Sequence, residues 1–195
     1  MPSRDGALHS DLRGDDPEAA ISAIQTACRD QRADVLPDLI ALLASEHVGN
    51  FVEECLPSFG ENIAKPLKNL LHDPATPTLA RQRAAGILAL FGEQEAVPVL
   101  LKAIESPDVN QAYFDRLIKL APERLADTLA TVLEENADHV LTTTDLQQAR
   151  YFAKLILTLG DVGAQRRLSG ILERLLHGAR DWRVQGAAAE ALAVR

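Results

Sequence analysis

The chain has 195 residues, of which 47% are hydrophobic and only 4% are aromatic. Its core must therefore be mostly aliphatic, and a composition rich in Leu and Ala but poor in aromatic side chains favours helices over strands. With 20 Lys and Arg against 28 Asp and Glu, the net charge is −8; a chain of this charge repels phosphate backbones, which argues against DNA or RNA as the main partner.

The negative charge is concentrated at the N-terminal end of the chain. Residues 1–64 carry 12 acidic and 4 basic side chains, whereas residues 137–195 carry 6 acidic and 8 basic ones. Because an acidic surface attracts a basic partner and speeds its encounter, we expect a basic partner to bind at the N-terminal half.

The number of cysteines and the hydropathy of the chain indicate its cellular compartment. Cys28 and Cys55 are the only cysteines, too few for a disulfide framework or a metal cluster, and we expect both to be buried, reduced thiols. Residues 1–16 lack the apolar core of a signal peptide. The longest charge-free apolar stretch, residues 84–92, is much shorter than a membrane span. These features predict a soluble cytoplasmic protein without a membrane partner.

Helical spacing of apolar residues recurs along the whole chain. Ala80, Ala84, Ile87 and Leu88 show the pattern, and no stretch alternates every second residue, so the fold is predicted to be all-α. In chain order, we expect a short helix near 6–13, helix pairs near 17–45, 47–72, 77–105, 109–136 and 145–177, and a last helix near 181–194.

A nine-residue sequence repeat, which we call the internal echo, relates two of these pairs. Residues 59–67 and 91–99 lie 32 positions apart and are identical at five of nine positions, which indicates stacked helix pairs that bury one another's apolar faces. Gly60, Gly92 and Gly160 are expected to end the first helices of their pairs. Residues 144–147 have the pattern of a capping box. Residues 137–144 are expected to be an insertion in a loop between repeats, which either forms a binding edge or is only a longer linker.

A family resemblance adds to this pattern. Residues 181–193 read Asp-Trp-Arg-Val-Gln-Gly-Ala-Ala-Ala-Glu-Ala-Leu-Ala and resemble the first helix of the phycobilisome-lyase type of HEAT-like repeat, D-x-x-V-R-x-x-A-A-x-A-L-G. Gln185 and Ala193 depart from that pattern. Residues 60–66 and 92–98 are similar to the start of the family's second helix, G-D-x-x-A-v-P.

The resemblance implies a right-handed α-solenoid of about five to six HEAT-like helix pairs, with residues 1–195 forming one array. Residues 1–15 would be a flexible segment or a short capping helix. Residues 181–195 would be the last helix, either a cap or a truncated repeat.

No residue pattern points to catalysis, a cofactor or a metal. None of the five histidines is followed by Glu, no two lie at i and i+4, and neither a G-x-S-x-G motif nor a glycine-rich phosphate loop is present. Adjacent acidic residues such as Glu134 and Glu135 are typical of a solvated helix face. We therefore expect no catalytic, cofactor-binding or metal-ligating residues.

Candidate partner-binding residues come from the second helices, which line the concave face of such arrays. The expected exposed positions are Asp34, Asp38, Lys68, Lys102, Asp127, Thr131 and Arg166. Tyr113 and Tyr151 would form either a tyrosine ledge for a partner or, as repeat-phased aromatics usually do, part of the core between repeats. Trp182, flanked by Asp181 and Arg183, resembles the Trp, Asp and Arg set of HEAT-like DNA glycosylases. A nearby basic cluster is either a site for an anion or acidic partner or a solvated helix face; its members are Arg166, Arg167, Arg174, Arg180 and Arg183.

The leading hypothesis is a non-enzymatic scaffold or adaptor that binds a protein partner, with its oligomeric state left open. A more specific version is an immunity protein that masks a bacterial toxin. The competing class is an enzyme, either a HEAT-like DNA glycosylase or a bilin lyase.

Overall fold

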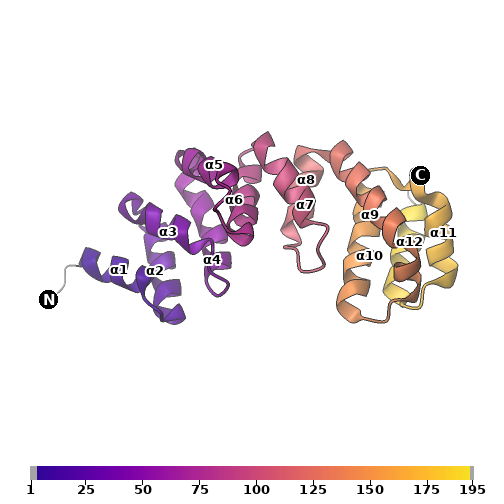
Figure 1. Ribbon diagram of the computed structural model, residues 1–195, viewed down its shortest axis with the longest axis horizontal. Coiled ribbons are helices and arrows are strands. Elements are labelled where there is room, and N and C mark those ends of the chain that lie inside the picture. The colour runs from indigo at the N-terminus through magenta and orange to yellow at the C-terminus, as the bar shows by residue number, and fades with distance from the viewer. Residues whose placement is uncertain (1–3, 194–195) are drawn as a thin grey trace. The chain divides into compact units, whose positions relative to one another are not determined.

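The structure of the protein is a computed structural model, which describes residues 4–193 (Figure 1). Residues 1–3 of the predicted N-terminal segment and residues 194–195 of the predicted last helix lie outside this range. Every regular element within it is helical, which confirms the all-α prediction. None of the helices described is long and apolar enough to cross a membrane.

The chain divides into two compact units, residues 1–100 and 101–195, and the boundary falls inside helix α7 (Val97–Ala103). Each unit has its own buried aliphatic core, with Ile24 and Leu39 in unit 1 and Leu129 and Leu155 in unit 2.

Unit 1 contains helices that agree closely with the expected ranges. They are α1 (Arg4–Arg13), α2 (Pro17–Arg29), α3 (Leu36–Leu42), α4 (Gly49–Cys55), α5 (Ala64–His72) and α6 (Thr78–Leu90), with 3-10 turns η1 (Ala33–Val35), η2 (Leu56–Ile63) and η3 (Gln94–Ala96). Helix α1 packs on α2 and α3, α2 on α4, and α6 on both α4 and α5 (Figure 1).

The two glycines of the internal echo have the backbone conformation that their position predicts. Gly60 has φ 68° and Gly92 has φ 77°, values that side chains of L-residues disfavour. Pro66 and Pro98 lie within the first turn of α5 and α7, where the backbone N–H groups have no helical partner to lose. The echo therefore encodes the turn into each second helix.

The prediction of reduced thiols is wrong in this structure. Cys28, in the last turn of α2, is joined in a disulfide to Cys55, the last residue of α4. Packing of α2 against α4 brings their Cα atoms to 5.9 Å, within the range of about 4.4–6.8 Å that disulfides span. A sequence separation of 27 residues hides this proximity until the helices pack.

A buried arginine holds the connection between α3 and α4. Arg83 of α6 is only 4% exposed. Its guanidinium donates to the carbonyl oxygens of Leu43 at 2.7 Å and Ser45 at 2.6 Å, and to Oδ1 of Asn50 at 2.9 Å. These bonds satisfy buried groups that would otherwise lose their water.

Within the described residues, unit 2 contains the end of α7, five further helices and one 3-10 turn. The five helices and the turn are α8 (Ala112–Leu120), α9 (Pro122–Thr142), α10 (Leu146–Asp161), α11 (Ser169–Gly178), α12 (Trp182–Ala193) and η4 (Gln165–Leu168). Helix α12 packs on α10 and α11, and α9 packs on α8, α10 and α11 (Figure 1).

Three local predictions in unit 2 are wrong. Residues 137–142 are helical and lengthen α9, so the extra residues extend a helix instead of forming a loop. Gly163, with φ 72°, makes the turn expected at Gly160. Gly160 lies inside α10 and packs against Ala191. A Cβ added to Gly160 would lie 3.4 Å from the Ala191 Cα. The N-cap of α10 is Asp145, which accepts from the Gln148 backbone N–H at 2.8 Å.

Candidate partner-binding surface

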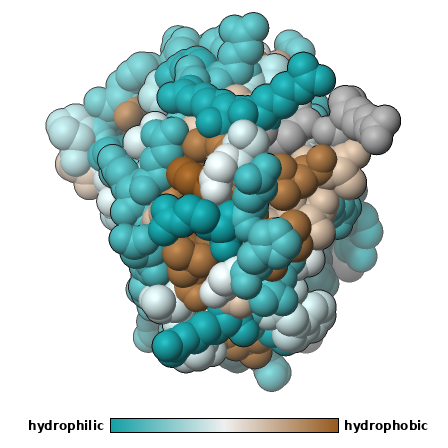
Figure 2. All heavy atoms as spheres, turned by 90° about the vertical axis from the view of Figure 1, so that its right-hand side faces the viewer, coloured by the Kyte–Doolittle hydropathy of each residue, from teal (hydrophilic) through white to brown (hydrophobic). Residues whose placement is uncertain are grey.

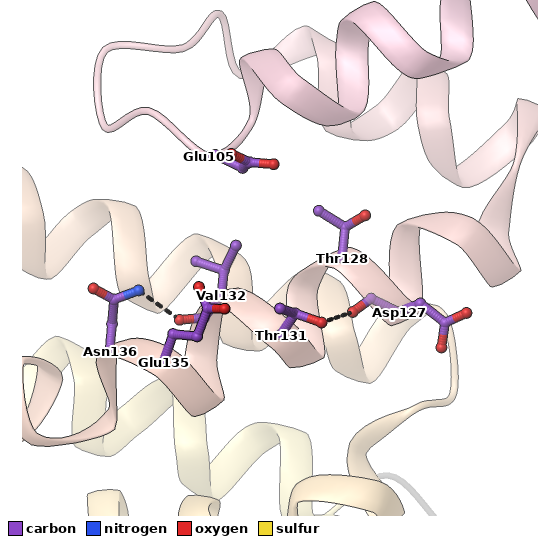
Figure 3. Close-up of a pocket in the computed structure, with 7 residues that line it drawn as sticks. All are labelled: Glu105, Asp127, Thr128, Thr131, Val132, Glu135 and Asn136. Atoms are coloured by element: carbon purple, nitrogen blue, oxygen red, sulfur yellow. Dashed lines mark hydrogen bonds between the residues drawn. The ribbon is translucent and has the colours of Figure 1, made fainter.

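A polar hollow of about 560 Å³ lies on unit 2, over the outward face of α9 (Figure 3). Thr128, Thr131, Val132 and Glu135 follow one another at i, i+3, i+4 and i+7, the spacing of a single helix face. A neighbouring face of α9 buries Leu125, Leu129 and Leu133. Burial of that apolar stripe turns the polar residues outward.

The far side of the hollow comes from another segment. Glu105, just after α7, lies across the hollow from α9 (Figure 3). Asp127 and Asn136 complete the lining on the helix side. The hollow thus carries three carboxylates, from Glu105, Asp127 and Glu135, together with two threonine hydroxyls.

Two of the three carboxylates already have a cation from within the chain. Asp127 pairs with Nη1 of Arg167 at 2.8 Å, with both side chains more than half exposed, and Glu105 pairs with Lys102. The exposed Glu135 side chain makes no ion pair with any side chain that the structure describes, in residues 6–164 and 166–193.

The hydrogen bonds of the polar lining leave acceptors facing the solvent. Thr131 Oγ1 donates to the Asp127 carbonyl oxygen at 3.0 Å, and Asn136 Nδ2 donates to the Val132 carbonyl oxygen at 2.7 Å (Figure 3). Since these donors are used by the backbone and the carboxylates accept only, the hollow offers acceptors to an incoming group. It suits ammonium or guanidinium groups.

Glu105 also affects a neighbouring tyrosine. Tyr151 is buried and its hydroxyl donates to the Ile104 carbonyl oxygen at 2.9 Å. Burial, with a smaller contribution from the Glu105 carboxylate, raises the pKa of Tyr151 to about 12. Tyr113 is buried as well, at 3% exposure. Both predicted tyrosines therefore pack in the core, and neither is available as a ledge.

In unit 1, the predicted carboxylates Asp34 and Asp38 are engaged within the chain. Asp38 accepts from His9 at 2.7 Å and pairs with Arg13 at 2.8 Å, and its side chain is only 13% exposed. Asp34 pairs with Arg32 at 2.7 Å and lies 3.6 Å from His9. These contacts tie α1 to the start of α3.

The pKa values of both carboxyl groups reflect these contacts. The hydrogen bond from Arg32 is the main cause that lowers the pKa of Asp34 to about 2. Burial alone would raise the pKa of Asp38, but hydrogen bonds from His9 and Arg13 outweigh it and the pKa is lowered. Both carboxyl groups are therefore ionised, and each is already paired with a basic side chain of the same chain.

The predicted residue Lys68 belongs to a second cluster of charges in unit 1. It pairs with Glu93 at 2.7 Å and Glu95 at 3.4 Å, and His72 donates to Glu95 at 3.0 Å. The hydrogen bond to Glu93 is the main cause that raises the pKa of Lys68. The pKa of Glu95 is lowered, chiefly by His72.

The remaining candidates, Arg166, Arg167 and Trp182, are on the surface of unit 2. Trp182 is 70% exposed at the start of α12, and the Arg183 guanidinium lies 4.7 Å from its ring centroid while pairing with Asp181 at 3.1 Å. Arg166 is exposed. Figure 2 shows the end of unit 2 that lies on the right in Figure 1, where hydrophobic patches lie among hydrophilic side chains.

Sequence reasoning identified part of the α9 hollow. Asp127 and Thr131, which line it, are among the predicted residues, as is Arg167, which pairs with Asp127. Glu105 and Glu135 are not. The helical spacing of Thr128, Thr131 and Glu135 is a signal that the sequence contains. Glu105 carries no such signal, because only tertiary packing brings it opposite α9.

Comparisons with known proteins add no family assignment. Neither a scan of protein-family models nor a comparison with curated proteins found a match to this chain. The described residues contain no group of His, Cys, Asp or Glu arranged to hold a metal ion.

Proposed function

We propose that this chain is a non-enzymatic, right-handed HEAT-like α-solenoid that acts in the cytoplasm as an adaptor and binds a basic segment of a protein partner. The observation that carries the proposal is the open hollow over α9, whose three carboxylates include Glu135, which makes no ion pair with the side chains that the structure describes. The helix pairs and the echo at residues 59–67 and 91–99 support the repeat architecture.

The ion pairs at the rim make the hollow accessible to a cationic ligand. Exposed ion pairs contribute only about 0–1 kcal/mol each, so a partner's lysine or arginine can displace Arg167 from Asp127 or Lys102 from Glu105 at small cost. The net charge of −8 adds a long-range attraction that raises the association rate and weakens with salt.

The test uses a fluorescent lysine- and arginine-rich peptide as the probe. We expect the chain to bind it at low ionic strength, and Glu105→Gln with Glu135→Gln to weaken binding by about 3- to 10-fold, as expected for losing two charge-assisted contacts. The double variant Glu123→Gln, Glu134→Gln is the matched control, because it removes the same two charges from exposed positions of α9 that do not line the hollow.

Two results would contradict the proposal. One is the absence of binding at low salt; the other is an equal loss of affinity in the control, since this would mean that only net charge matters. Replacing Asp34 and Asp38 by Lys tests the N-terminal location separately: a larger loss there than at α9 would place the partner on unit 1.

A further inference from the structure

The disulfide between Cys28 and Cys55 lies where two successive helices pack. Each cysteine is at the carboxyl end of its helix, α2 or α4, and the bridge connects residues 27 positions apart. Around it, Ile24, Ala27, Val52 and Leu56 are buried. The helices are therefore held together by apolar packing as well as by the covalent bond.

The same packing provides a place for the reduced pair. Cys55 Sγ lies 3.6 Å from the Ile24 carbonyl oxygen, a distance at which a thiol S–H can donate a weak hydrogen bond. Cys28 is 9% exposed and Cys55 is half-buried. The Ile24 carbonyl oxygen is therefore an acceptor for the reduced Cys55 thiol, and the more exposed Cys55 sulfur is the one that a solvent thiolate can reach.

We propose that Cys28 and Cys55 form a redox-responsive pair, which links α2 to α4 when oxidised and leaves the fold intact but less stable when reduced. In the oxidising direction, the Cys55 thiolate attacks a low-molecular-weight disulfide and expels one thiol. The Cys28 thiolate then attacks the mixed disulfide and expels the second. The protein loses two electrons and two protons, and the small disulfide gains them.

The position of the pair makes this exchange slow. The carboxyl end of a helix carries partial negative charge, which disfavours a thiolate there, and thiolates are the reacting species. The surrounding segment is acidic, with 12 acidic side chains in residues 1–64. The disulfide therefore forms under sustained oxidising conditions and does not respond to brief changes in the redox potential of the solution.

The experiment equilibrates the wild-type full chain in reduced or oxidised glutathione, traps free thiols with an alkylating reagent and determines the intact mass. We expect two labels per chain after reduction and none after oxidation. The thermal midpoint should fall by about 5–15 °C on reduction, because the opened loop regains entropy in the unfolded chain. Both changes should reverse when the buffer is exchanged.

Cys28→Ser, Cys55→Ser and the double variant are the controls, and their midpoints should not respond to glutathione. Three results would overturn the proposal: two labels after oxidation, equal midpoints of the wild type in both buffers, or covalent dimers on a non-reducing gel. Because the main comparison uses one wild-type chain in two buffers, a variant that fails to fold does not prevent the test.

Discussion

At Gly49 the backbone passes so close to the Arg83 guanidinium that no side chain fits between them. A Cβ at this position would lie 1.8 Å from Nη1 of Arg83 and 3.1 Å from the Leu42 carbonyl oxygen. Arg83 cannot withdraw freely, because it bonds to Leu43, Ser45 and Asn50. Gly49 is therefore required by its neighbours rather than by its backbone angles.

We predict that Gly49→Ala lowers the free energy of unfolding by about 2–4 kcal/mol, because it overpacks a buried site and displaces hydrogen-bonded groups. Chemical denaturation monitored by circular dichroism measures the change. Gly186→Ala is the matched control: it lies inside α12, with no atom within 4 Å of the added Cβ. There we expect a gain of about 0.5–1 kcal/mol from helix propensity. A loss at both positions, or at neither, would contradict this interpretation.

At the scale of elements, α1 is held to the start of α3 by charges. His9 and Arg13 of α1 contact Asp38, and His9 also lies near Asp34. Because the pKa values of Asp34 and Asp38 are lowered by folding, their ionised forms stabilise the folded state. That stabilisation is complete above the unfolded pKa near 3.8 and is lost as the pH falls through the folded pKa, which for Asp34 is about 2.

We therefore predict that the wild type is more heat-stable than the Asp34→Asn, Asp38→Asn double variant at pH 5, and that this advantage shrinks between pH 4 and pH 2 as both carboxyl groups become protonated. Thermal unfolding followed by circular dichroism across this range measures it. Asp11→Asn removes one charge from an exposed position of α1 and is the control. An advantage that stays constant down to pH 2 would rule out the proposed role of the two carboxylates.

The helices themselves were largely predictable, because helical spacing and turn residues are local features. Gly60 and Gly92 have the positive φ angles expected of glycines at these turns. Predictions failed where two local signals competed. Thr142 continues α9, although the threonine run had suggested a loop, and Gly163 rather than Gly160 makes the turn after α10.

At the scale of the whole molecule, the chain has two compact units, each with its own core. We predict that Leu155→Ala, at a fully buried position of unit 2, costs about 2–5 kcal/mol of unfolding free energy and accelerates amide exchange mainly in residues 101–195. Val52→Ala, at a fully buried position of unit 1, should act mainly on residues 1–100. Hydrogen–deuterium exchange resolved by peptide checks both, and equal acceleration throughout the chain in either variant would contradict the prediction.

The candidate site was predictable only in part. Asp127 and Thr131 could be found because they lie on the polar face of a strongly amphipathic helix. Asp38 has the same chemistry as Asp127 in the sequence, yet His9 and Arg13 cover it in the structure. Exposure of a carboxylate depends on which side chains from other helices approach it. The spacing of residues along one helix does not show these contacts.

Sequence by itself determines that this protein is all-α, approximately where each helix begins and ends, and which glycines turn the chain at the internal echo. These properties follow from periodicity and backbone preference within a few residues of each position. Tertiary structure alone decides that Cys28 meets Cys55, that His9 and Arg13 pair with Asp38, and that Glu105 faces α9. Each of these depends on helices that approach one another only after the apolar faces are buried.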